Sequence, residues 1–253
     1  MRDTAKQGID PLDFEKKSEI EEIREAIRRI CADFPDEYWR EKDDAHEFPW
    51  EFYEKMAEGG WIGIAIPESL GGGGRGITEA SVILEEIAAS GAAMNGCSAI
   101  HLSIFGMEPV RKYGSTELVA DVLPRVASGE LHVAFGVTEP DAGTDTTKIR
   151  TRAERDGDEY VITGAKVWTS KAPYCDMCLL LVRTTPYEEA ASPTDGISLF
   201  LVDLDDPAVD ITPIAKVGRN AVGRVKFATT VYGFQRHALS EAKVRVSAIF
   251  STG

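Results

Sequence analysis

The segment from His132 to Asp145, HVAFGVTEPDAGTD, joins an apolar run to a loop of small, hydroxyl and turn-forming residues. Its first half has the alternation of a strand, and Pro140 and Gly143 then favour a sharp turn. This turn leaves the hydroxyl groups of Thr138 and Thr144 free to bond a ligand. An ordinary surface turn after a strand has the same pattern, so this segment alone leaves both interpretations open.

Two cysteines, Cys175 and Cys178, form a CxxC pair. A zinc site would need two more Cys or His ligands at metal spacing, and the four histidines show no such spacing. On a strand, residues three apart face opposite sides, so we interpret the pair as packing residues and predict no metal site.

A glycine-rich segment, GGGGRG (Gly71–Gly76), has no Lys of the kind that a phosphate-binding loop carries. Such a loop would also follow a strand and open a helix. The preceding IPESL predicts a turn. We therefore interpret the segment as a flexible connector.

Composition excludes several classes of partner. The chain has 253 residues, 43% of them hydrophobic, which is enough for two modest domains, and its formal net charge is −14. So acidic a surface repels nucleic acid and anionic lipid. We interpret the charge as serving solubility, or life in high salt, rather than an acidic binding function. The start of the sequence lacks the pattern of a signal peptide, which predicts a cytoplasmic protein. The uncharged stretch Ile87–Met107 contains Asn95 and His101, so we predict a buried helix pair rather than a membrane span.

The first half of the chain has helical periodicity. In Ser18–Cys31 the isoleucines recur at spacings of three and four, which predicts an amphipathic helix. Start and stop signals predict further helices over Pro49–Trp61, Thr78–Ser90 with Thr78 as N-cap, and Ser115–Ser128 with Ser115 as N-cap.

Short strands replace helices after Leu131. Six runs have strand character: HVAFGVT, KIRTRAER, EYVITGAKVWTS, MCLLLVRTT, ISLFLVDL and VDITPI. Asp156-Gly157 between two of them predicts a hairpin. The order predicts an α+β chain, an all-α helical domain followed by a small antiparallel β-barrel or sheet, without the βαβ alternation of a Rossmann domain.

Two of these segments resemble a known signature. FGVTEPDAGTD followed by ITGAKVWTS resembles the flavin-contacting signature of the acyl-CoA dehydrogenase family. The segments GWIGIAIPESLGG, VRKYGSTELVADVLPRVASGE and KVGRNAV support the resemblance, which covers Phe48–Val222. It implies an N-terminal α-helical domain over residues 1–130 and a flavin-contacting middle β domain over residues 131–222.

The resemblance implies FAD as cofactor and assigns its contacts. The implied contact residues are Phe135, Val137, Thr138, Thr144, Trp168, Thr169 and Ser170. Thr138 and nearby amides would bond the pyrimidine end of the ring, Thr144 would lie near flavin phosphate or acyl-CoA substrate, and residues 168–170 would contact the ring edge. An isoalloxazine ring needs a flat apolar wall and a few fixed donors, and a strand end supplies the wall and rigid amides. Trp168 next to two hydroxyl residues further favours the flavin interpretation.

The implied reaction is the α,β-dehydrogenation of an acyl-CoA thioester to the enoyl-CoA. A carboxylate base takes the α-proton while the β-hydrogen leaves as hydride. In the family the base is usually a Glu of a C-terminal domain that this chain lacks, so no catalytic residue is assigned and we expect little activity from the chain alone. The resemblance also implies an electron-transferring flavoprotein as acceptor. Family members are homo-oligomers, but the domain that builds the usual tetramer is the missing one.

Two alternatives remain open. A relative with the same flavin pocket, an acyl-CoA oxidase or a nitroalkane oxidase, would be reoxidised by oxygen. A non-catalytic acyl-CoA-binding or protein-binding module would bind acyl-CoA without flavin. Acyl chain length depends on the depth of a pocket that the sequence does not give.

The last thirty residues depart from the family pattern after Val222. When the last base of each codon is read with the first two of the next, Glu241–Gly253 becomes G-G-E-G-S-G-F-R-Y-I-L-D-G, with free choice of synonymous codons. This contains the Gly-Glu-Gly-x-Gly-Phe turn that opens the family's C-terminal domain. We therefore interpret residues 223–253 as an aberrant tail produced by a one-base frameshift just after Val222, while a naturally divergent tail is the alternative.

Sequencing the locus across codon 222 tests this interpretation. We expect coding for a C-terminal domain to continue in the neighbouring frame. A neighbouring frame without such coding would establish a divergent tail instead.

Overall fold

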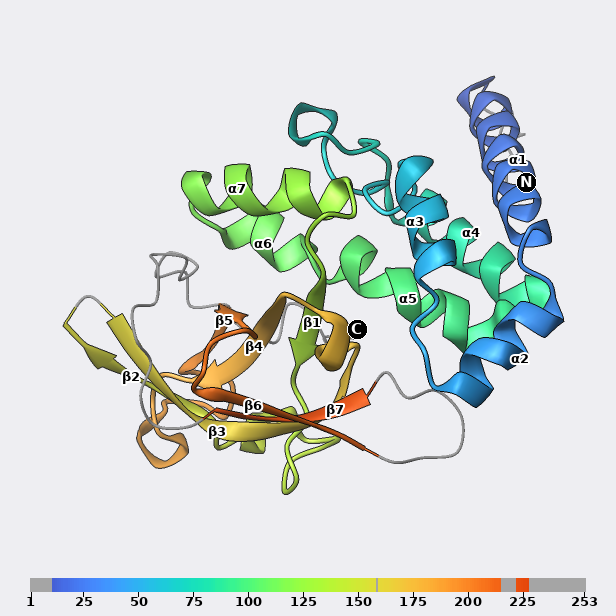
Figure 1. Ribbon diagram of the computed structural model, residues 1–253. Coiled ribbons are helices and arrows are strands. Elements are labelled where there is room, and N and C mark those ends of the chain that lie inside the picture. The colour runs from blue at the N-terminus through green and yellow to red at the C-terminus, as the bar shows by residue number, and fades with distance from the viewer. Residues whose placement is uncertain (1–10, 158, 215–221, 228–253) are drawn as a thin grey trace, which may run out of the picture.

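The computed structural model describes residues 11–157, 159–214 and 222–227 (Figure 1). The helices are α1 (Pro11–Ala32), α2 (Asp36–Ala45), α3 (Trp50–Glu58), α4 (Ile77–Ile87), α5 (Ala93–Phe105), α6 (Glu108–Tyr113) and α7 (Thr116–Ala127). The strands are β1 (Val133–Gly136), β2 (Arg152–Asp156), β3 (Glu159–Ser170), β4 (Met177–Arg183), β5 (Ile197–Asp203), β6 (Val209–Pro213) and β7 (Val222–Phe227). The predicted order, helices followed by strands, is confirmed.

Helix α1 packs on α4 through the isoleucine stripe seen in the sequence. Ile27 is fully buried, and Ile23 is nearly so. At the edge of this contact the carboxylate of Glu86 accepts hydrogen bonds from Arg24 and Arg28, the latter with Nε–Oε2 at 2.7 Å. These arginines, Arg28 above all, hold the pKa of Glu86 below its usual range. The charged edge thus fixes how α1 lies on α4.

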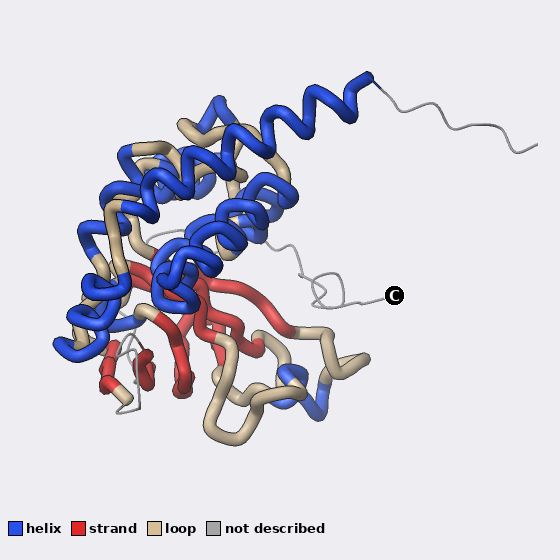
Figure 2. Tube along the Cα trace, turned by 90° about the vertical axis from the view of Figure 1, so that its right-hand side faces the viewer, coloured by secondary structure: helices blue, strands red, loops and turns tan. Residues whose placement is uncertain are grey.

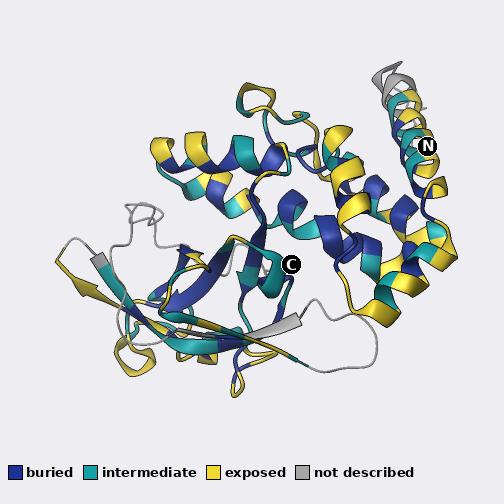
Figure 3. Ribbon diagram, in the orientation of Figure 1, coloured by how far each residue is buried: buried dark blue, intermediate teal, exposed yellow. Residues whose placement is uncertain are grey.

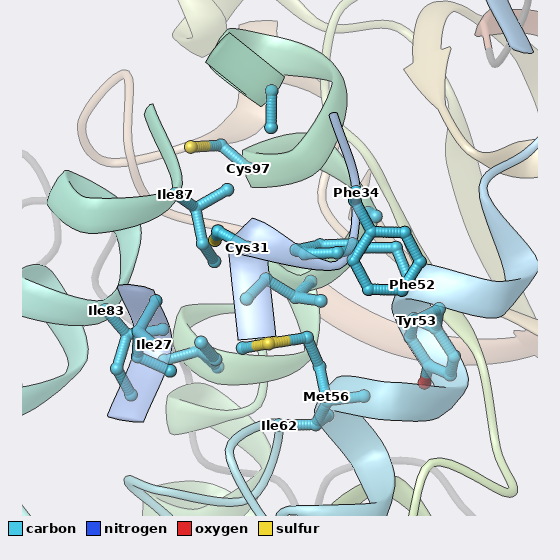
Figure 4. Close-up of a cluster of buried hydrophobic side chains, with 14 of the residues drawn as sticks. Ile27, Cys31, Phe34, Phe52, Tyr53, Met56, Ile62, Ile83, Ile87 and Cys97 are labelled. Carbon is cyan, nitrogen blue, oxygen red and sulfur yellow. The ribbon is translucent and has the colours of Figure 1, made fainter. Parts of the chain in front are cut away.

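Aromatic side chains form part of the buried core of the helical region (Figure 4). Phe52 of α3 meets Phe34 and Trp39 edge-to-face, with ring centroids 5.3 and 5.1 Å apart. Such pairs add to the gain from area burial. Met56 and Ile62 continue the same buried layer.

The uncharged stretch Ile87–Met107 folds as the end of α4, the π-helical turn η2 (Ala88–Ala92) and α5. Gly91 has φ +96, which a residue with a side chain rarely adopts, and the helix axis changes there. Within the described residues, no helix is long and apolar enough to cross a membrane.

The strands form one open, mixed sheet in the order β1-β4-β2-β3-β7-β6, with β5 on β4. The predicted β2–β3 hairpin is confirmed, and Gly157 has φ +62 at its turn. The predicted fold class, a helical domain followed by a small β-barrel or sheet, is confirmed in its sheet form, because the described strands do not close. The sheet is mixed rather than antiparallel, since β1 pairs with β4 in parallel, as β2 does at one residue pair. Turn residues signal neighbouring hairpins, but no local signal marks a pairing between strands forty residues apart.

Strand β4 is buried on both faces, which explains its continuous apolar run. Leu179 and Leu181 face the core formed with α6 and α7. Cys178 and Leu180 face the core formed with β2, β3 and β7. The helices therefore cover one side of the sheet (Figure 2). Strand β4, which is drawn as buried in Figure 3, lies between these helices and the core formed with β2, β3 and β7.

Strand β7 includes the first residues of the predicted aberrant tail. Its backbone pairs with β3 from Gly164↔Phe227 to Ser170↔Val222, and with β6 on its other side. The rest of that tail, residues 228–253, lies outside the described residues.

Two isoleucines of α4 provide a matched test of the α1–α4 contact. Ile83 is fully buried, whereas Ile77 is 69% exposed. We expect Ile83→Ala to lower the free energy of unfolding by about 2–5 kcal/mol, because it leaves a cavity in the helical core. Ile77→Ala should change it by less than about 0.5 kcal/mol. Urea unfolding measures both, and equal effects would contradict the packing described.

Candidate functional site

The two segments that the sequence singled out lie side by side. The backbone N–H of Val167 in β3 donates to the carbonyl of Thr138, just beyond β1, at 2.9 Å. This bond places Thr138 next to Trp168, although thirty residues separate them in the chain. The two predicted ligand-binding segments therefore form one surface.

A buried ion pair holds this junction together. Lys166 Nζ lies 2.8 Å from Glu139 Oε1 and donates to the carbonyl of Val137 at 3.0 Å. The Glu139 carboxylate also accepts from the backbone N–H groups of Arg150, at 2.6 Å, and Thr151, at 2.9 Å. One ion pair thus joins the end of β1, the start of β2 and the middle of β3.

The environment keeps Glu139 ionised. Burial on its own would raise the pKa of Glu139, but the charge of Lys166 and the hydrogen bonds together hold that pKa below its usual range. Lys166 is fully buried and Glu139 nearly so. Neither residue was among the predicted site residues, although a lysine inside an apolar strand run is a signal that could have revealed the pair.

Gly136 lets β1 approach this lysine closely. A Cβ atom at Gly136 would lie 2.9 Å from Leu180 Cδ1 and 3.3 Å from Lys166 Cγ. Any side chain there would push β1 away from β3 and β4. The glycine in FGVTE is therefore required by packing.

Trp168 lies at an irregularity of β3. The pairing of β3 with β7 shifts register between Lys166 and Thr169, and Trp168 has φ +61. This left-handed conformation is rare for a bulky residue and marks a local strain. The residue is 58% exposed, which is unusual for a tryptophan.

The other predicted contact residues differ in accessibility. Phe135, Val137, Thr138 and Ser170 are partly exposed. Thr169 is buried, and its Oγ1 has no hydrogen-bond partner in the described part of the chain. The predicted contact residues around the Thr138–Val167 bond are therefore accessible, except that the Thr169 side chain is buried.

Thr144 is exposed on a separate loop that is fixed at both ends. Glu139 N donates to Ala142 O at 2.9 Å at its start, and Asp145 Oδ1 accepts from Thr147 N at 3.2 Å at its end. The buried Arg183 donates to the carbonyl of Thr147 from below. The loop therefore presents the Thr144 hydroxyl in a defined place.

The glycine-rich segment takes no part in this site. Its backbone N–H groups bond the preceding turn, with Gly73 N to Gly63 O at 3.0 Å and Gly74 N to Ile66 O at 2.8 Å. It is a hydrogen-bonded loop, so the expectation of a flexible connector is wrong. These amides are not free to bind phosphate.

Comparison with protein families agrees with this geometry. The profile of the acyl-CoA dehydrogenase N-terminal domain matches residues 17–130, and that of the middle domain matches residues 134–230. The chain belongs to the acyl-CoA dehydrogenase family. The middle-domain match includes the Thr138–Trp168 junction and all of β7.

Relatives in the acyl-CoA dehydrogenase family are longer than this chain. Acyl-CoA dehydrogenase FadE12 of Mycobacterium tuberculosis is 35% identical over 204 residues, which cover 79% of this chain and 50% of FadE12. The long-chain specific acyl-CoA dehydrogenase of Sus scrofa mitochondria is 34% identical over 186 residues, which cover 74% of this chain and 42% of that protein. The chain thus spans about half the length of the curated relatives that it matches.

Solved structures of acyl-CoA dehydrogenase relatives share the fold. The ChsE4-ChsE5 complex from Mycobacterium tuberculosis matches with a TM-score of 0.71 at 30% identity, over 90% of this chain and 55% of that chain. An acyl-CoA dehydrogenase from Geobacillus kaustophilus matches with a TM-score of 0.75 at 27% identity, over 84% and 56%. The helical and mixed-sheet arrangement is therefore that of the family.

The ion pair gives a testable dependence on sequence and pH. Glu139→Gln should lower the free energy of unfolding at pH 7 by about 3–5 kcal/mol, because it leaves the buried Lys166 without its counter-charge. Urea unfolding measures this loss. The control Glu154→Gln changes an exposed carboxylate of β2 and should cost less than about 0.5 kcal/mol.

Acid unfolding separates this pair from other carboxylates. The lowered pKa of Glu139 means that its stabilising effect is fully present above the ordinary glutamate pKa of about 4.3 and is lost as the pH falls through the lowered value. The stability of Glu139→Gln should therefore fall less steeply in that range than that of the wild type. Parallel acid-unfolding curves would contradict the role assigned to the pair.

Proposed function

We propose that this chain supplies the flavin wall and part of the substrate site of an FAD-dependent acyl-CoA dehydrogenase. The observation that carries the proposal is the hydrogen-bonded junction that sets Thr138 beside the exposed ring of Trp168. In an ordinary surface turn, nothing would require Thr138 and Trp168 to lie side by side. An exposed tryptophan in a strained backbone conformation is costly unless a ligand covers it.

The residues at the junction fit an isoalloxazine. In this proposal Phe135, Val137 and Trp168 would form the apolar wall, while Thr138 and Ser170, both partly exposed, would bring hydroxyl groups to its edge. Thr169 is buried, so its predicted ring-edge contact is the least accessible of the three at residues 168–170. Thr144 presents a hydroxyl to flavin phosphate or to acyl-CoA.

When bound, FAD would take up the hydrogen lost from the β-carbon as an acyl thioester becomes an enoyl thioester. The chain's own residues bind and orient the ring and exclude water from one of its faces. The carboxylate base that the reaction needs belongs, by family resemblance, to a domain outside the matched segments. No described residue is assigned that role.

The proposed partners follow from the family. CarC of Acetobacterium woodii, which is 32% identical over 198 residues, is by name a subunit of a caffeyl-CoA reductase-Etf complex. This supports an electron-transferring flavoprotein as the acceptor and a coenzyme A thioester as the substrate. We place the protein in the cytoplasm, and expect the homo-oligomer of the family only where the full set of domains is present.

The chain alone should bind FAD weakly and show negligible dehydrogenase activity. We expect purified protein to carry far less than one flavin per chain, measured by absorbance, and to show no bleaching with acyl-CoA. Stoichiometric yellow flavin that acyl-CoA reduces would contradict this expectation.

A single substitution tests the flavin wall itself. Trp168→Ala should weaken FAD binding by about tenfold or more, a loss of about 1.4 kcal/mol, in a titration of flavin fluorescence. Ile77→Ala, which removes an exposed apolar side chain from α4, is the matched control and should leave the affinity unchanged. Equal affinities for the two variants would refute the assignment of Trp168.

A further inference from the structure

The residue that follows the ring-edge segment is a buried lysine in an unusual backbone conformation. Lys171 comes directly after β3, is fully buried and has φ +63. Trp168, three residues earlier, is also left-handed. Glycine and asparagine adopt this conformation more easily than lysine does. A lysine here needs a reason that lies in its side chain.

That side chain crosses from the β part to the helical part. Lys171 Nζ donates to the carbonyl of Ala99 in α5 at 3.0 Å and lies 5.9 Å from the ring centroid of Tyr53 in α3. Nearby, in the turn η4 (Ala172–Tyr174), Tyr174 Oη donates to the carbonyl of His46 at 3.3 Å. The chain beyond Ser170 is therefore attached to the helical part at several points.

Burial of the Lys171 amine is energetically unfavourable. Across the described residues, no carboxylate lies within ion-pair distance of it, in contrast to Lys166. Burial lowers the pKa of Lys171, since water no longer stabilises its charge. A methionine would fill much the same volume without that cost. What lysine adds over methionine is a directed hydrogen bond to α5 and the attraction of a cation for an aromatic ring.

We propose that Lys171 is a positioning residue that sets the segment Trp168–Ser170 at a fixed distance and angle from α5. It acts through its neighbours: the bond to Ala99 holds the left-handed turn, and the turn determines how the Trp168 ring and the Ser170 hydroxyl face a ligand. The position of Trp168 is a property of the chain itself. Its consequence for flavin binding rests on the function proposed above.

Fluorine NMR of protein labelled with 5-fluorotryptophan tests the position directly. The chain has four tryptophans, and the Trp168 signal is assigned by its loss in Trp168→Phe. Lys171→Met keeps the length of the side chain but loses the donor and the charge. Lys171→Asn suits the left-handed backbone but cannot reach Ala99, and it serves if Lys171→Met does not fold. We expect the Trp168 signal to shift or broaden in both variants, and the Trp61 signal to stay.

A matched destabilised variant separates positioning from general loss of stability. Ile27→Val removes one methyl group from the helical core at a cost of about 0.5–1.5 kcal/mol. It should leave the Trp168 signal and the FAD affinity unchanged. The Lys171 variants should weaken FAD binding by about tenfold, a loss of about 1.4 kcal/mol.

The two readouts distinguish failure of this inference from failure of the proposed function. An unchanged Trp168 signal in the folded Lys171 variants would overturn the positioning role. A displaced Trp168 signal supports that role, even where neither the wild type nor any variant binds FAD. In that case it is the flavin assignment that fails.

Discussion

The buried ion pair between Glu139 and Lys166 is the constraint on which the candidate site depends. It connects three segments that have no local reason to meet: the chain after β1, the start of β2 and the middle of β3. Such a pair contributes little net stability, because desolvation offsets the attraction. Its effect is on register, since a shift of β3 by one residue would turn Lys166 to the other face of the sheet and leave the buried Glu139 without its counter-charge. The pair therefore selects one alignment, and that alignment puts Thr138 beside Trp168.

The conformation of Trp168 follows from this alignment. Lys166 must face inward to reach Glu139, and Thr169 is also buried. Residues three apart on a regular strand face opposite sides, so the register shift of β3 falls on the two residues between them. Trp168 takes up the change with a positive φ and directs its ring to the surface. The two buried lysines thus act at either end of one short segment. Lys166 fixes its start through a carboxylate, and Lys171 ends it through a carbonyl of α5.

Sequence patterns predicted those features that local physics decides. Apolar periodicity located α1 and six of the seven described strands. Ser115 caps α7 as expected, with its Oγ accepting from Leu118 N at 3.2 Å. The N-cap of α4 was predicted at Thr78 but lies at Gly76, whose N–H donates to the Glu79 carboxylate at 2.9 Å. Gly76 can be the N-cap although it has no side chain, because the Glu79 carboxylate accepts a hydrogen bond from its backbone N–H. The parallel pairing of β1 with β4, the burial of Thr169 and the Glu139–Lys166 pair all depend on distant segments, so no local pattern revealed them.

The charge of the chain poses a problem for any phosphate-bearing ligand, since a net charge of −14 repels anions. The loop around Thr144 illustrates how the repulsion can be offset locally. Its exposed Asp145 is partly neutralised by Lys148, 3.4 Å away, while the guanidinium of Arg183 lies buried beneath it. Arg183 donates to the carbonyls of Thr147, Pro193 and Asp195, and in the part of the chain that the structure describes no carboxylate lies within ion-pair distance of it. Its positive charge is therefore not cancelled at short range, and because water is excluded from around it, salt screens it less than it screens a surface lysine. The acidic surface and the buried positive charge under this loop are thus compatible, because the surface charge acts at long range and the guanidinium of Arg183 acts on the loop next to it.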